Sequence, residues 1–472
     1  MGYNKSINNY LMLEIAGRPY IDVYLSLASL LPNNLPNKLK KKILSDQIDY
    51  LQMNSHLHDK IEFRVAFSSF DFNFDSRSKK ILSSLNKDEI DILKQELIIF
   101  TNKIVKEGLK KNYNTTLKRA IDFNNNNFSD DLEYIKTNGT FPFAISARHA
   151  FIGMAFLKSA ISEKILSEYR LEEIFKNIKT IASEVVAAIN DLKKGNISKK
   201  EFNQFCGHLR PGTYDITSDR YDNNSEFFLS SSGVLETKDY NIETNILTFL
   251  EEKKINSLLK KNKLSFNSKD LMEYIISSTV CREENKFLFT KHLSNLLEKI
   301  KIYGQKLGFT KEELSFMDID EITQLNSVKS KKLINQKSKL YKDRMSIKTP
   351  DFIKNLDNLS IVRYPKGKPN FITTKVSVGK IHVFKNNEVA QLKNKILMIE
   401  AADPGYDWVL SQSIAGLITM YGGANSHIAI RCAEFNIPAA IGCGEMIYNQ
   451  YQQGDLVEID AQKEIIRILK NA

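Results

Sequence analysis

The fold is indicated most clearly by one stretch near the C-terminus, residues 421–442, which reads YGGANSHIAIRCAEFNIPAAIG. Two glycines release the backbone after an apolar run, and the small polar residues Asn425 and Ser426 are suited to cap a helix. His427 then falls in the first turn of that helix. The stretch predicts a strand, a glycine turn, a helix and a second strand.

The same arrangement favours binding of a phosphate group next to His427. A helix N-terminus has unpaired backbone N–H groups and a partial positive charge, so it could hold an anion attached to the ring. We expect Gly422, Gly423, Asn425 and Ser426 to support that phosphate. The positive helix end also disfavours imidazolium, so we expect a neutral, nucleophilic ring. The alternative is a capping or surface histidine without chemistry.

The rest of the chain is predicted to be mainly helical. Its 472 residues suffice for two to four domains of roughly 100 to 200 residues each. The 20 glycines and 10 prolines are few for a β-rich protein. Apolar residues recur at helical spacing, as at Leu44, Ile48 and Leu51, up to about residue 345. We therefore expect a helical region over residues 1–345.

The pattern changes in the last third of the chain. Prolines and glycine at 350, 365, 367 and 369 predict a linker over 346–370, because proline restricts itself and the preceding residue to extended geometry. Beyond it, short β-branched runs flank the helix of His427. The predicted fold class is therefore multidomain, with a mainly α-helical N-terminal region and a C-terminal α/β domain over 371–472.

Composition limits the other functions. Lys and Arg exceed Asp and Glu by 67 − 56 = 11, which suggests nucleic-acid binding only weakly because no recognition motif surrounds the lysines. We expect neither a membrane span nor a signal peptide, and hence a cytoplasmic protein. No metal site is expected in this chain: the four cysteines are scattered, and His56, His58 and Asp59 lack a third spaced ligand.

The stretch around His427 resembles the swivelling phosphohistidine domain shared by phosphoenolpyruvate synthase, pyruvate phosphate dikinase and rifampin phosphotransferase. The resemblance covers about residues 370–472 and implies that His427 accepts phosphate from ATP and passes it on. Ala424 and Asn425 stand where many dikinases have a regulated threonine, so that regulation is not expected. Asn436 replaces the usual glycine before Ile-Pro and can adopt the same left-handed conformation.

The family resemblance also implies a partner. Dikinases load the histidine from an ATP-grasp region, and nothing in this chain resembles one or a Walker loop. We therefore expect ATP and Mg²⁺ on an ATP-grasp domain or subunit elsewhere, with AMP and phosphate as co-products. We also do not expect this chain to contain the (β/α)₈ barrel that binds phosphoenolpyruvate in synthases and dikinases. The acceptor is then expected in the helical region, as in rifampin phosphotransferase.

The helical region is similar to a polysaccharide-locus subgroup that includes L-glutamine kinase. The similarity rests on the segments 15–22, 57–62, 141–151 and 207–222. It implies a small polar acceptor, with the L-glutamine amide as the best single choice, for a capsular phosphoramidate. A segment containing Asp403 and Asp407 also looks like this subgroup, and either carboxylate could approach the phosphorylated ring.

The chemically richest segment is 207–222, GHLRPGTYDITSDRYD. Arg210 and Arg220 could clamp a carboxylate or phosphate, and His208 or Asp215 could remove a proton from the acceptor. A salt-bridged loop between helices is the alternative. The acceptor-binding candidates are Arg18, Arg148, His208, Arg210, Tyr214, Asp215 and Arg220.

Charged residues within the helices allow two interpretations. Arg282, Glu283, Glu284 and Lys286 would need partners if buried, and such groups either pair structurally or line a polar cavity. Two further functions stay open: a non-catalytic phosphocarrier that docks a partner, and a phosphoenolpyruvate synthase-like protein with another acceptor. An acceptor-sized pocket lined by the arginines of 207–222 favours an enzyme, whereas a flat apolar helical face favours docking.

Overall fold

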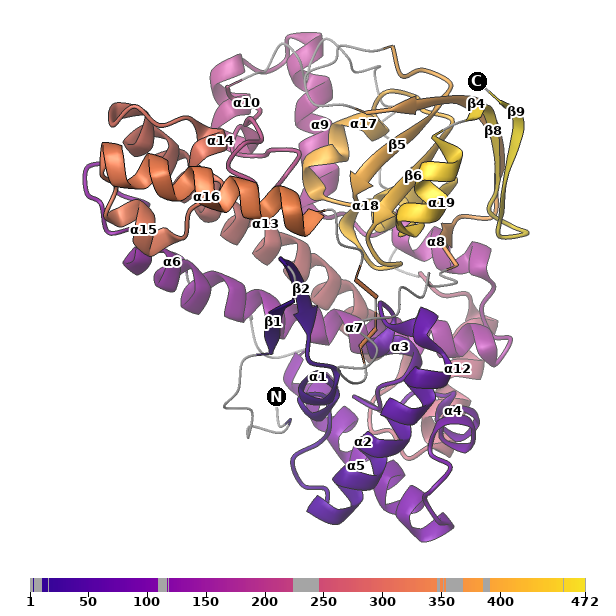
Figure 1. The fold of residues 1–472 in the computed structure, drawn as a ribbon. Coiled ribbons are helices and arrows are strands. Elements are labelled where there is room, and N and C mark those ends of the chain that lie inside the picture. Colours follow the sequence, from indigo (N-terminus) through magenta and orange to yellow (C-terminus); the bar gives the residue numbers. More distant parts are fainter. Residues whose placement is uncertain are drawn as a thin grey trace.

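The computed structural model describes residues 3, 11–15, 17–108, 117, 119–223, 246–345, 349–350, 352–353, 368–384, 391–452 and 454–471. A mainly helical region precedes Met345, and a sheet module follows from Asn370 (Figure 1). This is the expected fold class of helical region and C-terminal α/β domain. The expected linker, 346–370, lies mostly outside the described residues, so the domain boundaries stay predictions.

The elements of the helical region are β1 (Met12–Ile15), β2 (Arg18–Ile21), α1 (Val23–Ala28), α2 (Asn37–Met53), η1 (Ser55–Leu57), α3 (Ile61–Arg64), α4 (Phe74–Ile81), α5 (Lys87–Gly108), α6 (Phe128–Ile135), η2 (Lys136–Thr140), α7 (Phe141–Ser162), α8 (Glu168–Lys176), α9 (Ile181–Lys194), α10 (Lys199–Cys206), α12 (Phe249–Lys261), α13 (Ser268–Lys306), α14 (Lys311–Leu314), α15 (Ile319–Thr323) and α16 (Ser327–Met345).

Helix α13 organises this region. It has 39 residues and starts at a reciprocal cap, in which the Asn267 side chain accepts from the Asp270 backbone and the Asp270 side chain accepts from that of Asn267. It packs along α7 and also contacts α5, α6, α9 and α12. A buried ion pair of 2.7 Å between Lys299 and Asp131 joins α13 to α6. Because α13 runs past so many helices, it can present side chains to distant parts of the molecule.

Within the part of the chain that the structure describes, one helix is long and apolar enough, by length and composition alone, to cross a membrane. It covers Phe128–Ser162, the continuous run of α6, η2 and α7. In the structure its α7 part lies against α13, and the buried residues of α7 include Ile152, Phe156 and Leu157. Its apolar character is therefore explained by a place in the helical core.

The elements of the C-terminal module are β3 (Asn370–Ile372), β4 (Val376–Val383), β5 (Lys395–Ala401), η4 (Pro404–Tyr406), α17 (Asp407–Leu410), β6 (Gly416–Tyr421), α18 (His427–Glu434), β7 (Ala439–Ile441), α19 (Gly444–Tyr451), β8 (Gly454–Asp460) and β9 (Ile465–Asn471).

The module is a seven-stranded sheet in the order β3-β7-β6-β5-β4-β8-β9. Strands β4, β5, β6 and β7 pair in parallel, and β3, β8 and β9 pair antiparallel at the edges. Alternate residues of β5 enter different cores: Leu397 and Ile399 pack with α17 and α18, whereas Ile396 and Met398 pack with α19. The sheet is thus covered on both faces, and β6 leads directly to the loop before α18.

The module and the helical region share an apolar core. Val185 and Ile189 of α9, Phe202 of α10 and Tyr221 belong to the same buried cluster as Trp408 of α17. In Figure 1 the gold module accordingly lies beside the magenta helix α9. The structure therefore shows the module docked on the helical region.

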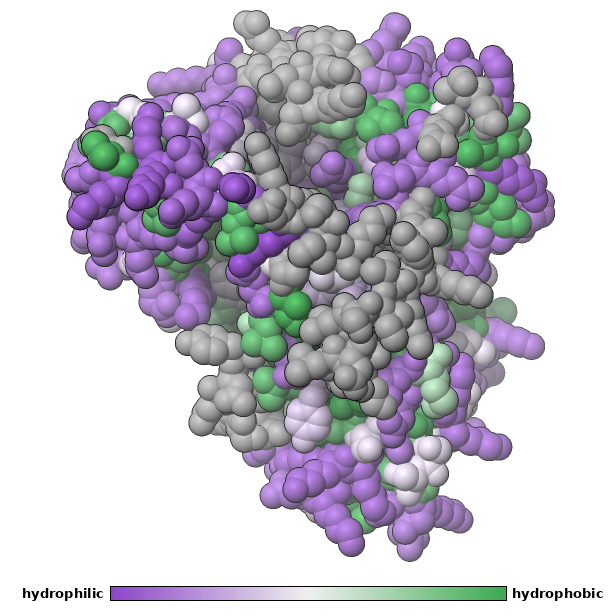
Figure 2. All heavy atoms as spheres, in the orientation of Figure 1, coloured by the Kyte–Doolittle hydropathy of each residue, from purple (hydrophilic) through white to green (hydrophobic). Residues whose placement is uncertain are grey.

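The surface is mainly hydrophilic in the view of Figure 2, with apolar patches over the sheet module. Exposed apolar side chains on the module include Val376 and Val378 of β4 and Leu469 of β9. Scattered apolar side chains are normal on protein surfaces and do not by themselves indicate a binding site.

Candidate active site

The local structure around His427 follows the sequence prediction. Ser426 is the N-cap of α18, where its hydroxyl oxygen accepts from the Ala429 N–H at 3.3 Å, and His427 is the first helical residue. Gly422 has a φ of 128°, and a Cβ there would lie 2.5 Å from the Cβ of Ala402. Only glycine fits that turn without strain. Asn436 ends the helix with a left-handed φ of 55°.

The His427 ring lies between two carboxylates from different parts of the molecule. Its Nε2 is 2.7 and 2.8 Å from the two oxygens of Asp407, the first residue of α17. Its Nδ1 is 3.1 Å from Oε2 of Glu283, which belongs to α13. The side chain is 7% exposed. The ring is therefore buried at the contact between the module and the helical region, and the helical region supplies one of its two partners.

The two carboxylates change the charge of the ring. Burial alone would lower the pKa of His427, but the charges and hydrogen bonds of Asp407 and Glu283 outweigh burial and raise this pKa to about 9. The expectation of a neutral ring is therefore wrong for the docked arrangement. The partial charge of a helix end is weaker than two full charges at hydrogen-bond distance. Burial raises the pKa of Glu283, but Arg282 and His427 outweigh it and hold that pKa well below its usual range.

Two cations complete the site. Arg282 donates from Nη2 to the backbone oxygen of Asn425 at 3.1 Å, and its Nη1 is 3.5 Å from Glu283. Lys286 is one turn further along α13, where burial lowers its pKa and the charges of Glu283 and Asp407 oppose that shift. A phosphoryl group on His427 would thus lie near two positive side chains of α13.

The segment 207–222 contacts the module directly. The carboxylate of Asp403 accepts from the hydroxyl of Thr213 and, at 3.3 Å, from its N–H. The Tyr221 hydroxyl donates to the backbone oxygen of Gly405 at 2.9 Å. A Cβ at Gly405 would lie 1.6 Å from the backbone oxygen of Arg210. The turn at 403–405 and the 207–222 loop therefore fit together backbone against backbone.

The two arginines expected to clamp the acceptor are occupied by the protein itself. Arg210 is 2% exposed and donates to Ser294 and to the backbone oxygens of Asp215 and Ser218, and it lies 3.7 Å from Glu298. Arg220 forms a two-pronged pair with Asp222 at 2.6 and 2.9 Å, and its Nη1 donates to Asn295 at 2.9 Å. Both guanidinium groups stabilise the loop. This arrangement agrees with the alternative interpretation of 207–222 as a salt-bridged loop between helices.

The other candidates of this segment do not converge on His427. His208 is buried edge-on against Phe287, and burial holds its pKa well below the usual value, so it is a neutral core residue. Asp215 accepts from the N–H and hydroxyl of Thr217, each at 2.8 Å, and stabilises its own turn. Tyr214 is 61% exposed. Their roles in binding an acceptor stay predictions without geometric support.

Arg18 and Arg148 have structural partners as well. Arg18 donates to the backbone oxygen of Arg344 at 3.2 Å and so ties β2 to the end of α16. Arg148 donates to the backbone oxygen and the hydroxyl of Ser29 at 3.0 and 3.1 Å, and stacks over the ring of Tyr3. These contacts hold both arginines to the N-terminal elements of the helical region, so their roles in binding an acceptor also stay predictions.

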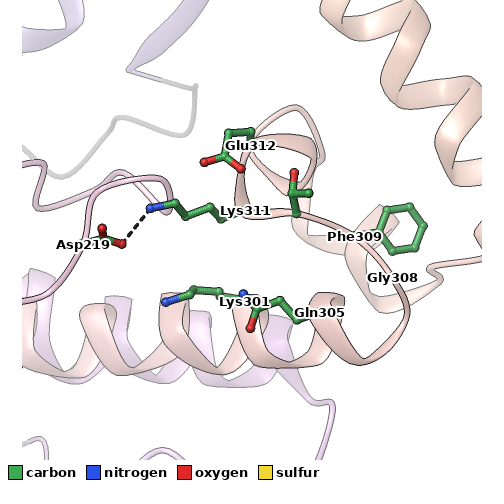
Figure 3. Close-up of a pocket in the computed structure, with 8 residues that line it drawn as sticks. Asp219, Lys301, Gln305, Gly308, Phe309, Lys311 and Glu312 are labelled. Carbon is green, nitrogen blue, oxygen red and sulfur yellow. Dashed lines mark hydrogen bonds and ion pairs between the residues drawn. The ribbon is translucent and has the colours of Figure 1, made fainter. Parts of the chain in front are cut away.

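A surface cavity of about 380 Å³ lies at the far end of α13. Figure 3 shows Lys311 reaching Asp219 across its mouth at 2.7 Å, with Lys301 below. Asp219 belongs to the 207–222 loop, but Arg210, Asp215 and Arg220 are not among the residues that line this cavity. The cavity therefore does not serve as the expected arginine-lined acceptor pocket.

The sequence alone does not connect Glu283 with His427. The charged run 282–286 is compatible with either paired or cavity-lining side chains, and Asp407 is one of two carboxylates expected near the ring. No local sequence pattern indicates that Glu283 contacts His427, because the two residues are 144 positions apart.

Two comparisons with known proteins bear on this site. Residues 391–464 match the family described as PEP-utilising enzyme, mobile domain. A rifampicin phosphotransferase from Bacillus cereus is 25% identical over 166 residues, which are 33% of this chain and 18% of that relative. The chain thus spans about a fifth of the relative's length. The matches support the expected superfamily for the module; the L-glutamine kinase subgroup stays a prediction.

Proposed function

We propose that this chain is the phosphoryl-carrying and acceptor-binding part of a dikinase-type phosphotransferase. His427 receives a phosphoryl group that originates from ATP and passes it to a small polar acceptor beside α13. The observation that carries the proposal is the position of His427, held between Asp407 of its own module and Glu283 of the helical region. The mobile-domain match supports the same assignment.

The charges around the ring suit the transfer step. The phosphorylated ring enters the step protonated on its second nitrogen. The phosphorus–nitrogen bond breaks, a bond from phosphorus to the acceptor forms, and the proton lost by the acceptor goes to the freed ring nitrogen. Asp407 and Glu283 stabilise the imidazolium that results, in agreement with the raised pKa of His427. Arg282 and Lys286 offset the negative charge of the phosphoryl group in transit. Docking therefore favours release of phosphate from the ring.

Loading requires the opposite condition, a neutral nucleophilic nitrogen. When the module leaves the helical region, Asp407 travels with the ring and Glu283 stays behind on α13. The ring then loses one carboxylate, which lowers its pKa toward the usual value. We place ATP and Mg²⁺ on an ATP-grasp domain or subunit, with AMP and phosphate as co-products. That partner would supply the metal-assisted activation of ATP.

The identity of the acceptor rests on resemblance. The L-glutamine amide, in synthesis of a capsular phosphoramidate in the cytoplasm, is the best single choice, and a phosphoenolpyruvate synthase-like protein with another acceptor is the alternative. The Bacillus cereus relative is named for rifampicin and shares only part of its length with this chain.

The experiment combines the chain with an ATP-grasp partner, Mg²⁺ and radiolabelled ATP, and follows label on His427 and on L-glutamine. Wild type should form an acid-labile phosphohistidine and then a phosphorylated acceptor. His427→Ala should form neither, whereas His56→Ala, at an exposed histidine outside the site, should behave as wild type. Normal product formation by His427→Ala would rule the mechanism out.

A second candidate is a phosphocarrier without an acceptor of its own. In this case the helical region serves only as the surface on which the module docks, through the apolar cluster that the module shares with α9 and α10. In that case label would accumulate on His427 with every small molecule tested and would leave only when a protein partner is added.

A further inference from the structure

A row of cations and aromatic rings leads away from the His427 site. The guanidinium carbon of Arg282 lies 5.7 Å from the centre of the Phe151 ring. That ring meets Phe63 of α3 edge-on at 5.1 Å, and the ammonium of Lys158 lies 4.7 Å from the centre of Phe63. Phe63, Phe151 and Lys158 are all half-buried, so each keeps a solvent-facing part. The row is therefore accessible from the surface.

The outer end of the row gathers positive charge without a paired carboxylate. Burial, Arg64 and Lys60 together lower the pKa of Lys158 to about 8, and the charge of Glu168 opposes this shift. Among the described residues, Lys158, Arg64 and Lys60 form no ion pair. Like charges held together around a half-buried amine destabilise the free protein. An anion bound there would remove that repulsion.

The row lies beside the loop that carries His427. Asp59, which precedes Lys60, accepts from the side chain of Asn370 at 3.3 Å, and its backbone oxygen would be 3.7 Å from a Cβ at Gly423. At the inner end, Arg282 donates to the backbone oxygen of Asn425. The inner end of the row thus touches the loop that carries His427, and the residue Asp59, shortly before Phe63 in the chain, contacts the module as well.

We propose that Lys158, Arg64, Phe63 and Phe151 form an acceptor subsite for a carboxylate or phosphate attached to a planar or apolar group. The anion of the acceptor lies against the cations Lys158 and Arg64. Its planar or apolar part covers the rings of Phe63 and Phe151, over which cations already lie. The reactive end of the acceptor then points along the row toward Arg282. The subsite rests on the proposed function, because it defines what His427 phosphorylates.

The test is calorimetric titration of the whole chain with benzoate, phenyl phosphate and inorganic phosphate. The subsite predicts that at least one aromatic anion binds, and that Lys158→Met weakens it about tenfold or more. Lys80→Met is the matched control, because Lys80 also lies over a ring, that of Tyr50 at 5.6 Å, but on α4. Its affinity should equal that of wild type. The preferred probe identifies carboxylate or phosphate as the recognised anion.

Several results would overturn the subsite. They are binding of neither aromatic anion, equal affinity of wild type and Lys158→Met, or equal loss in Lys80→Met. Inorganic phosphate binding as tightly as phenyl phosphate would remove the rings from the subsite. Phe63→Leu checks this separately: it should weaken phenyl phosphate several-fold and leave inorganic phosphate unchanged. Circular dichroism of each variant establishes that it is folded.

Failure of the subsite can be told apart from failure of the proposed function. Lys158→Met should accept phosphate on His427 at the wild-type rate and lose only the transfer to an acceptor. If wild-type His427 is never phosphorylated while Lys158→Met still loses anion binding, the anion site stands and the phosphotransfer proposal falls. If phosphorylation and transfer both proceed normally in Lys158→Met, the subsite falls alone.

Discussion

Replacing Gly405 by alanine should uncouple the module from the helical region. Gly405 lies in the turn that meets the 207–222 loop, and the added Cβ would be 1.6 Å from the oxygen and 2.2 Å from the carbon of the Arg210 carbonyl group. Ordinary van der Waals contact begins at 3.4 Å. The clash is with backbone atoms, so no rotation of a side chain relieves it, and the two parts must separate locally by more than an ångström.

The hydrogen bonds that this separation breaks set the size of the effect. They are the bond from Tyr221 to the Gly405 oxygen and those from Thr213 to Asp403, each worth about 0.5–1.5 kcal/mol. Loosening the buried pair of His427 and Glu283 adds to this, because breaking a buried ion pair costs about 3–5 kcal/mol. A total above about 3 kcal/mol shifts the docking equilibrium by about a hundredfold or more.

The assay uses the one tryptophan of the chain, Trp408, which is 1% exposed within the shared apolar cluster. In Gly405→Ala its emission should move to longer wavelength and become quenchable by acrylamide. Diethyl pyrocarbonate, mapped by mass spectrometry, should modify His427 in the variant and spare it in wild type. The variant should also take up phosphate and fail to transfer it.

The matched control is Gly423→Ala, at a second glycine of the same contact. A Cβ there would have its nearest neighbour, the backbone oxygen of Asp59, at 3.7 Å, which is an ordinary distance. Its tryptophan emission and His427 protection should match wild type. The docking geometry is refuted if Gly405→Ala keeps both signals unchanged, or if both glycine variants change them equally.

Three further predictions concern the same site. Docking should weaken as pH rises, because the pKa of His427 is raised from 6.5 to about 9. The contribution of the protonated ring to docking is complete below pH 6.5 and is lost as pH rises through about 9. A pH titration of Trp408 emission should show this loss, and the pH dependence should be flatter in Glu283→Gln. Asp407→Asn should slow both phosphorylation of His427 and transfer to the acceptor, whereas Glu283→Gln should slow transfer only, because only Asp407 moves with the ring. Single-turnover labelling separates the two steps. Identical defects in the two variants would contradict these roles of the carboxylates. Arg210→Met should lower the free energy of unfolding by about 3 kcal/mol or more, since its buried hydrogen bonds lose their donor; unchanged stability in denaturant with a raised acceptor KM would instead restore its clamp role.

Features encoded within a few neighbouring residues could be predicted well. Ser426 caps α18, Gly422 has the positive φ that its place in the turn suggests, and Asn436 ends the helix with positive φ. The parallel strands on either side of that helix also agree with the apolar runs at 416–419 and 437–442. Each of these depends on backbone preferences and caps that act within one or two turns.

The orientation of charged side chains could not be predicted in the same way. Arg210 resembles a ligand clamp because it lies beside a Pro-Gly turn, yet its guanidinium turns inward to Ser294 of α13. The expected neutral state of His427 is wrong for a related reason, since it depends on the helix end alone and not on the carboxylate of a distant helix. Composition and spacing show which groups need partners but not which partners they find.

The sequence by itself therefore determined the phosphohistidine-type module, its glycine loop and the helical character of the remainder. Only the tertiary structure decided that Glu283 faces His427, that the 207–222 loop receives the module, and that Lys158 continues a row of rings and cations beside it. The physical reason is the separation along the chain over which each interaction acts. Helix periodicity and capping are settled between near neighbours, whereas these contacts join segments more than eighty residues apart, whose meeting depends on how whole helices and the sheet pack together.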